Sequence, residues 1–396
     1  MTNTLPLRSS RLISIDAFRA IIMVLMIFVN DLWTLVGIPT WLEHVNAETD
    51  GMGLADIVFP AFLFIVGLSV PYAIESRMRK GDSTLQIFLH ILSRTIALLV
   101  MGLFLVNAEN YSDQAVLPRG IWMITLIVAF FLLWMDYKNP QALVVKGAKA
   151  TGLLLLLALI YTFETANGRG FKAMEVSWWG ILGLIGWAYF ISSSVYLFSN
   201  GKLWVLIPAL LFFVFFSSGN YLGWLDPLAE LKKYVWISGD GSMPALAMVG
   251  ILTTLAYKKL TSQNRLFWIY TTALAVVLIL FGYLTRPIWG ISKINATPSW
   301  TTICAGLSII GFLLMVFLTD VKKITKWYTP IKPAGTSTLT SYLLPYIHYA
   351  ILGMFWIQLP LFFRTGAVGL LKSLCYAILI VLLTGILEKR NIRLKI

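Results

Sequence analysis

Charged side chains are scarce in this chain. Asp, Glu, Lys and Arg make up 12% of its 396 residues and hydrophobic residues make up 58%, whereas soluble domains carry roughly 25% charged residues. This composition excludes an ordinary soluble protein. It predicts an all-α, polytopic transmembrane helix bundle, because a helix needs roughly 20 apolar residues to cross a bilayer. Twelve spans are predicted, at residues 17–37, 56–75, 86–106, 119–135, 149–164, 178–199, 203–218, 243–257, 266–284, 300–319, 337–358 and 367–387.

Cysteine and histidine are also rare, with two and three residues. Cys304 and Cys375 both lie inside apolar segments, which excludes a disulfide framework and a zinc site, so no metal is expected. The segment before the first span lacks a small-residue cleavage site, and this span is therefore expected to remain in the mature protein. The 15 Trp and 16 Tyr residues are typical of the aromatic belts at membrane interfaces.

Acidic residues are few as well, 18 against 31 Lys and Arg. We assume twelve spans and a cytoplasmic N-terminus, and we leave out Arg94 because it lies within the third span. The inner side then holds 21 basic and six acidic residues, and the outer side holds nine basic and twelve acidic residues. This asymmetry predicts both termini in the cytoplasm and loop 38–55 outside. The basic residues are spread between apolar runs, so nucleic acid is not an expected partner. No repeat or linker divides the chain, and residues 1–396 are taken as one transmembrane domain in the lipid bilayer.

Polar residues collect where the first span ends and the second begins. Asn30 and Asp31 lie near the end of the first span, His44 lies in the loop, and Asp56 opens the second span. An imidazole titrates near neutral pH and a carboxylate can hold its tautomer, so His44 with Asp56 is a candidate general base. Ionisable groups at membrane depth are functional candidates because they are costly to bury. The rival interpretation is a wet interfacial loop, with Asn30 and Asp31 bonding other helices.

Several segments resemble the heparan-α-glucosaminide N-acetyltransferase family. They read RLISIDAFRA at 11–20, MIFVN at 26–30, HVNAETDGMGLADIVFPAFLFIVGLS at 44–69 and SRTIALLVMGLFLVN at 93–107. Weaker similarities follow in order, at 179–189, 238–252, 292–300 and 335–344. The chain departs from the family pattern at Ala20, which replaces a glycine, and at Asp50, which replaces the asparagine of an Asn-Gly turn. The region of the fourth and fifth spans is additional.

The resemblance implies a transmembrane N-acetyltransferase that moves the acetyl group of cytoplasmic acetyl-CoA to the amine of a terminal or free glucosamine. It implies His44 as the catalytic histidine, with Asn30 and Asp56 beside it. The imidazole would act as a general base or carry the acetyl group transiently. Heparan-derived glucosamine, a free amino sugar and a cell-wall fragment all remain possible acceptors. Family analogy also implies a homodimer, and in a bacterium the protein would lie in the inner membrane.

The phosphates of acetyl-CoA need cationic partners at the inner face. Arg11, Arg19 and Arg94 are the candidates for this cosubstrate. Asp16 lies three residues before Arg19 on the same helical face, so a structural ion pair is the rival interpretation for Arg19.

Four more residues are predicted to bind substrate: Asp31, Asp50, Lys293 and His348. Lys293 matches a lysine of the family and is expected to meet an acidic sugar or to cap the site. For His348, inside the eleventh span, a hydrogen-bonded helix histidine is the favoured interpretation, and a residue that lines the cavity is the rival one.

Two other functions fit parts of the pattern. A twelve-span secondary transporter would share the layout, although its site would lie near the midplane of the membrane. A membrane O-acyltransferase of another family would use a histidine to modify a hydroxyl. Consumption of the thioester separates enzyme from transporter, and the amide or ester linkage of the product separates the two enzymes.

Overall fold

The structure, a computed structural model, describes residues 12–166, 168–235 and 240–396. Fourteen α-helices of the described residues form most of it: α1 Ile13–Asp31, α2 Leu54–Arg79, α3 Thr84–Asn107, α4 Arg119–Trp134, α5 Leu143–Thr162, α6 Ile181–Phe198, α7 Leu203–Tyr221, α8 Ala229–Lys232, α9 Ser242–Leu260, α10 Arg265–Trp289, α11 Pro298–Met315, α12 Lys332–Thr336, α13 Thr338–Met354 and α14 Gly366–Lys389. A π-helical segment, Val316–Val321, extends α11. Two short strands, β1 Glu164–Thr165 and β2 Gly168–Arg169, pair antiparallel after α5.

The predicted all-α membrane architecture is confirmed, and each of the twelve predicted spans falls on a helix. Within the described residues, nine helical segments are long and apolar enough to cross a membrane. They contain α1, α2, α3, α5, α6, α7, α10, α11 and α14. Helices α4, α9 and α13 cover the other three predicted spans but are not among the nine, so the count of twelve stays a prediction.

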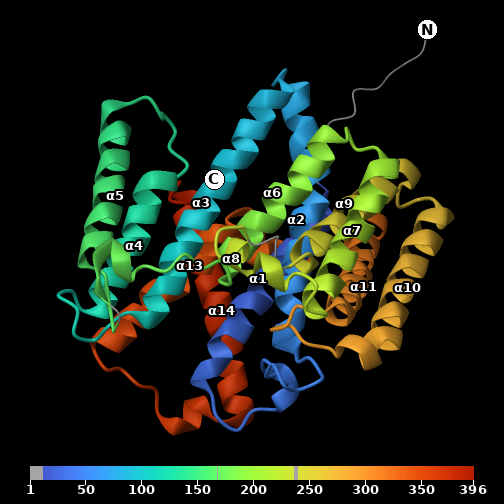
Figure 1. Cartoon of the computed structure of the whole chain (residues 1–396). Helices are drawn as coiled ribbons and strands as arrows, with labels where there is room; N and C mark the ends of the chain where they lie inside the picture. Colours follow the sequence, from blue (N-terminus) through green and yellow to red (C-terminus); the bar gives the residue numbers. More distant parts are fainter. Residues whose placement is uncertain (1–11, 167, 236–239) are drawn as a thin grey trace.

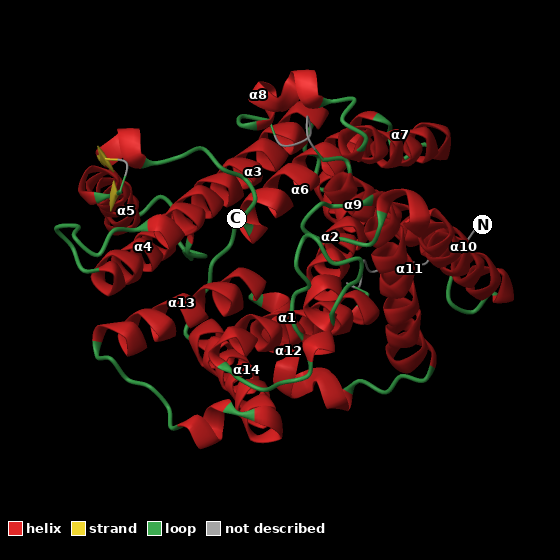
Figure 2. Ribbon diagram, turned by 60° about the horizontal axis from the view of Figure 1, so that its bottom comes forward, coloured by secondary structure: helices red, strands yellow, loops and turns green. Residues whose placement is uncertain are grey.

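Helices α2 and α9 pack closely together at the centre of one half of the bundle (Figures 1 and 2). Two glycines permit the close approach: a methyl group on Gly67 would collide with the Ala247 carbonyl, and one on Gly250 with the Phe64 carbonyl. Small residues are the usual means of bringing helices together in lipid, where packing replaces the hydrophobic driving force. The first turn of α2, which carries Asp56, therefore extends from a well-packed helix.

The outer helices differ sharply from the central ones. The apolar windows of α2 and α11 are both 67% buried, whereas those of α5, α7 and α10 are 17%, 22% and 22% buried. Helices α5 and α10 lie at opposite edges of the molecule in both ribbon views (Figures 1 and 2). Apolar side chains turned outward on edge helices are what a lipid-facing surface requires.

Helices α1 and α14 run antiparallel. Near the start of α1, Arg19 donates to the Gly335 carbonyl of α12, and near the end of α14, Glu388 accepts from Thr336 of the same short helix. At the other end, Asp31 of α1 meets Lys372 of α14. The start of α1 and the end of α14 therefore share one end of the bundle. Which face of the membrane that is stays a prediction.

Candidate active site

A cavity of about 1420 Å³ opens at the end of the bundle where α1 ends and α2 begins. Its walls come from α1, α2, α3, α6, α9 and α13 and from the loop before α11. Ligand pockets usually measure about 300–1,000 Å³, so this one is large. On α13 the lining runs from Tyr349 to Tyr342, two helical turns or about 10 Å at 1.5 Å per residue.

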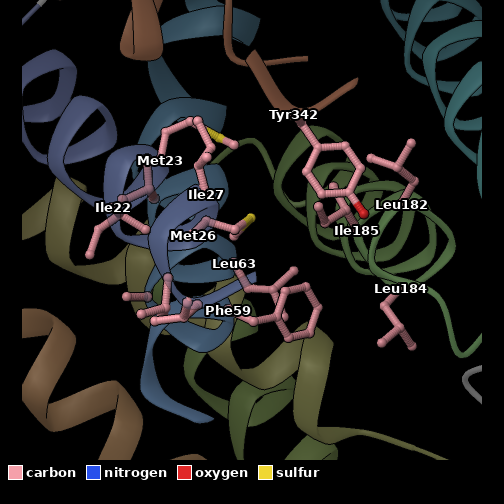
Figure 3. Close-up of a cluster of buried hydrophobic side chains, with 14 of the residues drawn as sticks. Ile22, Met23, Met26, Ile27, Phe59, Leu63, Leu182, Leu184, Ile185 and Tyr342 are labelled. Atoms are coloured by element: carbon pink, nitrogen blue, oxygen red, sulfur yellow. The ribbon is translucent and has the colours of Figure 1, made fainter. Parts of the chain in front are cut away.

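The deep part of the cavity is apolar. Figure 3 shows side chains of α1 and α2, among them Ile27 and Phe59, facing Leu182 and Leu184 of α6 and Tyr342 of α13. All five line the cavity, and all five are at least nine-tenths buried. An apolar floor beneath a polar mouth keeps bulk water away from the bonds that change.

At the mouth, the His44 Nδ1 atom lies 2.7 Å from the Asp56 Oδ1 atom. The second carboxylate oxygen accepts hydrogen bonds from the amides of Val45, at 3.1 Å, and Gly53, at 3.0 Å. Asp56 is the third residue of α2, so bonding the amide just before the helix also caps it. The Asp56 side chain is 2% exposed and that of His44 is 50% exposed. A buried carboxylate thus holds an accessible imidazole.

This contact assigns the histidine tautomer. An ionised carboxylate only accepts hydrogen bonds, so His44 Nδ1 carries the proton and donates it to Asp56. In the neutral ring Nε2 is then unprotonated and can accept a proton. The predicted contact between His44 and Asp56 is therefore present, in the arrangement that general-base chemistry needs.

Lys293 completes the group. Its Nζ atom lies 3.1 Å from His44 Nδ1 and 3.8 Å from Asp56 Oδ1. Because Nδ1 already donates to the carboxylate, it cannot also accept from the ammonium, and we treat the lysine as a partner of Asp56. Burial lowers the pKa of Lys293 although the Asp56 charge opposes the shift. The lysine therefore lies beside the pair of His44 and Asp56, and its two predicted roles stay predictions.

The last turn of α1 presents two neighbouring residues in different directions. Asn30 is exposed and lines the cavity. Asp31 is buried and accepts hydrogen bonds from Tyr349, Lys372 and Ser373, at 2.6, 2.7 and 2.6 Å. Asp31 does not line the cavity, but it accepts a hydrogen bond from Tyr349, which does. Its predicted contact with substrate is thus replaced in this structure by contacts within the protein.

Asp50 joins two loops that are far apart in sequence. Its carboxylate accepts from Arg286 Nε at 2.8 Å and from the Ile291 amide at 2.6 Å, while the Gly51 amide donates to the Ile291 carbonyl. Burial opposes ionisation, but the bonds from Arg286 and Ile291 outweigh it and hold the pKa of Asp50 below its usual value. Asp50 does not line the cavity. It fixes the His44 loop against the Lys293 loop.

The predicted cosubstrate arginines lie away from the mouth. Arg19 bonds Asp16 at 3.1 Å and Ser69 at 2.6 Å, which confirms the predicted Asp16 pair. Arg94, inside α3, stacks its guanidinium 4.9 Å from the centre of the Tyr189 ring, and its buried Nε has no hydrogen-bond partner. Arg11 lies outside the described residues. Neither Arg19 nor Arg94 lines the cavity.

The prediction that His348 lines the cavity is wrong. Its ring packs against those of Tyr349 and Tyr376, with centres 5.3 and 4.9 Å away. The α13 residues that do line the cavity include Pro345 and Tyr346. Successive helix residues point about 100° apart. His348 therefore points away from the side of α13 that lines the cavity and faces α14 instead.

Several cavity residues were not predicted from the sequence. They are Glu43, Glu109 and Asp240, together with the aromatic residues Trp33, Trp41, Trp179, Tyr342, Tyr346 and Tyr349. Tryptophans at span ends resemble an interfacial belt, so the sequence carries no signal that distinguishes belt from cavity wall.

Comparisons with known proteins give the family of the chain. The family model described as "Domain of unknown function (DUF5009)" matches residues 11–240, more than half of the chain and the whole of the His44 region. The chain belongs to this family. Two curated relatives are the heparan-α-glucosaminide N-acetyltransferases of mouse, 33% identical over 137 residues, and human, 36% identical over 101 residues.

These relatives are similar over limited stretches. The matches cover 32% and 26% of this chain, but only 20% and 14% of the mouse and human proteins. The chain thus aligns with a fifth or less of each relative's length. The similarity supports a relationship at the level of the family.

Proposed function

We propose that this protein is a membrane acetyltransferase that moves an acetyl group from acetyl-CoA to the amine of an amino sugar. The observation that carries the proposal is the half-exposed His44 held by the buried Asp56 at the mouth of a large cavity. The relatives named as N-acetyltransferases support the reaction class.

The bound ammonium must first release one proton to solvent, because an ammonium group cannot attack a thioester. The neutral amine then attacks and must lose a second proton to a base. Nε2 of His44 takes the amine proton as the nitrogen–carbon bond forms, and Asp56 stabilises the resulting imidazolium. The carbon–sulfur bond then breaks, and the imidazolium returns the proton to the CoA thiolate. Products are an N-acetylated sugar and free CoA, with His44 neutral again. A two-step variant, in which the imidazole carries the acetyl group between donor and acceptor, uses the same residues.

Asn30 supplies a donor for the oxyanion. Its amide is exposed in the cavity, and among the described residues no partner is recorded for it. One well-placed oxyanion donor contributes about 2.7–4 kcal/mol to transition-state stabilisation in other enzymes. Lys293 shares the Asp56 carboxylate and keeps the pair in place.

The acetyl-CoA enters from the end of the bundle opposite the sugar. Arg94 supports this route, because a buried guanidinium nitrogen without a partner inside a membrane helix is costly unless it serves a ligand. Arg19, the other candidate within the described residues, has Asp16 as a competing partner, and Arg11 stays a prediction.

The test is release of CoA by the purified full-length protein, given acetyl-CoA with and without glucosamine. Glucosamine-dependent release with formation of N-acetylglucosamine is expected, and His44→Ala should reduce it by about 10²–10⁴-fold. His348→Phe is the matched control: it changes a histidine that does not line the cavity and keeps a ring against Tyr376. It should retain activity. Folded wild type that releases no CoA with any amino sugar would overturn the proposal in favour of transport, and an ester product would indicate an O-acyltransferase.

A further inference from the structure

The charges around the cavity are mostly negative. Its described lining includes the carboxylates of Glu43, Asp56, Glu109 and Asp240, against one lysine or arginine, Lys293. Since Lys293 lies 3.8 Å from Asp56, these two charges offset one another. Glu43 and Glu109 add two further carboxylates, so the described lining carries an excess of negative charge.

Two of these carboxylates are available to a ligand. Among the described residues no hydrogen bond or ion pair is recorded for the side chains of Glu43 and Glu109. Arg119 attracts Glu109 without forming an ion pair with it. Inside a cleft with low-dielectric walls such charges act strongly, since the field lines are focused into the opening. The cavity therefore favours a cation and repels an anion.

Aromatic side chains line the same opening. Trp33, Trp41 and Trp179 are 72%, 66% and 52% exposed, and all three contribute to the cavity wall. An indole face attracts an ammonium group through its quadrupole, and it offers an apolar surface to the C–H face of a sugar ring. Carboxylates and indoles together match a ring that carries a positive charge.

We infer that the cavity selects an amino sugar with a free ammonium group and no sulfate, phosphate or carboxylate, and that Glu43 and Glu109 determine this specificity. The inference rests on the proposed function, which makes the ligand an amino sugar, and it adds the charge that this sugar carries. A sulfated, heparan-like chain end would meet like charge on entry. Lys293, expected from the sequence to meet an acidic sugar, is occupied by Asp56.

The test is binding of two sugars that differ in one anionic group, glucosamine and glucosamine 6-sulfate. Isothermal titration uses the full-length protein in nanodiscs of neutral lipid, without acetyl-CoA. Glucosamine should bind tighter by about fivefold or more at low salt, and the ratio should fall as salt screens the charges. The double variant Glu43→Gln/Glu109→Gln should bring the ratio to within about twofold.

Glu48→Gln is the matched control, because Glu48 belongs to the same loop, is exposed and does not line the cavity. It should leave the ratio unchanged. Equal or tighter binding of the 6-sulfate, no measurable binding of either sugar, or a ratio that survives the double variant would overturn the inference. Binding needs no turnover, so the proposed function and the charge selectivity can be tested separately. The expected binding ratio without acetyl transfer would contradict the acetyltransferase proposal. Equal acetylation of both sugars would contradict the selectivity.

Discussion

Two buried aspartates near one end of the bundle are held in different ways. Asp31, at the end of α1, accepts three hydrogen bonds from Tyr349, Lys372 and Ser373, and its side chain is 4% exposed. Asp56, at the start of α2, is equally buried, but its histidine partner is 50% exposed and lines the cavity. Each aspartate also has a lysine within 4 Å.

The difference lies in the partners rather than in the carboxylates. Every recorded donor to the Asp31 side chain belongs to a helix packed against it, so the cluster joins α1 to α13 and α14. At Asp56 one donor is an imidazole whose second nitrogen remains available to a ligand. Burial of a charge therefore does not identify chemistry by itself, whereas an accessible titratable partner at a cavity does.

The largest expected effect separates the two aspartates. Asp56→Asn removes the charge that stabilises the imidazolium, and it should lower kcat by about 10²–10⁴-fold. Its loss of stability should be smaller than that of Asp31→Asn, because the Asn oxygen can still accept from the Val45 and Gly53 amides and the lysine contact is longer, at 3.8 Å. Asp31→Asn should instead lower the stability and change kcat little, because breaking a buried ion pair costs about 3–5 kcal/mol of folding free energy. CoA release and thermal unfolding of both variants measure the two effects.

A result in which both variants lose activity equally, with equal unfolding temperatures, would contradict the comparison. Ser373→Ala serves as the milder control in the Asp31 cluster, since it removes one donor and leaves the ion pair with Lys372 in place.

A smaller effect concerns Lys293 and pH. Its pKa is lowered by burial, so between that value and the unfolded value of about 10.4 the unfolded chain binds more protons and wild-type stability rises with pH. Lys293→Met removes this titrating group, while Asp56 keeps His44 and two backbone amides as donors. The excess, which is the stability of the variant minus that of wild type, should shrink as the pH rises towards about 10.

Thermal unfolding across this pH range measures the excess, with Lys172→Met, at an exposed side chain, as the control for losing one positive charge. An excess that grows with pH would mean that Asp56 stabilises the ammonium more than burial destabilises it.

The smallest effect is expected at Asp50. Its pKa is lowered, since hydrogen bonds from Arg286 and Ile291 outweigh burial, so its contribution to stability exists above the unfolded pKa and disappears as pH falls through the folded one. The pair is about half exposed, and Asp50→Asn should cost at most about 1 kcal/mol at neutral pH. Unfolding temperatures of wild type and variant should converge in acid; a constant gap, or the same gap in Glu48→Gln, would contradict this account.

Local patterns in the sequence predicted much of this arrangement. Apolar runs marked the helices because crossing lipid requires internal satisfaction of every backbone hydrogen bond. The pair of Asp16 and Arg19 follows from a three-residue helical spacing. His44 and Asp56 are twelve residues apart on a short loop, so the chain itself brings them together.

Contacts between distant segments could not be predicted in this way. Asp31 and Lys372 are separated by 341 residues, and Asp50 and Arg286 by 236. Which helices become neighbours depends on the packing of the whole bundle, and nothing near Asp31 in sequence indicates Lys372. The same reason explains His348: its segment was correctly predicted as a helix, but the side that faces the cavity depends on how α13 is rotated against α14.

Two hydrogen bonds link the two loops at the mouth of the cavity, and they limit how these loops can move. The Gly51 amide donates to the Ile291 carbonyl, and the Ile291 amide donates to Asp50. Neither loop can swing outward alone without breaking both bonds. The two segments, some 240 positions apart along the chain, should therefore move together. Deuterium should enter both amides at a common rate, and that rate would report how often the two loops separate.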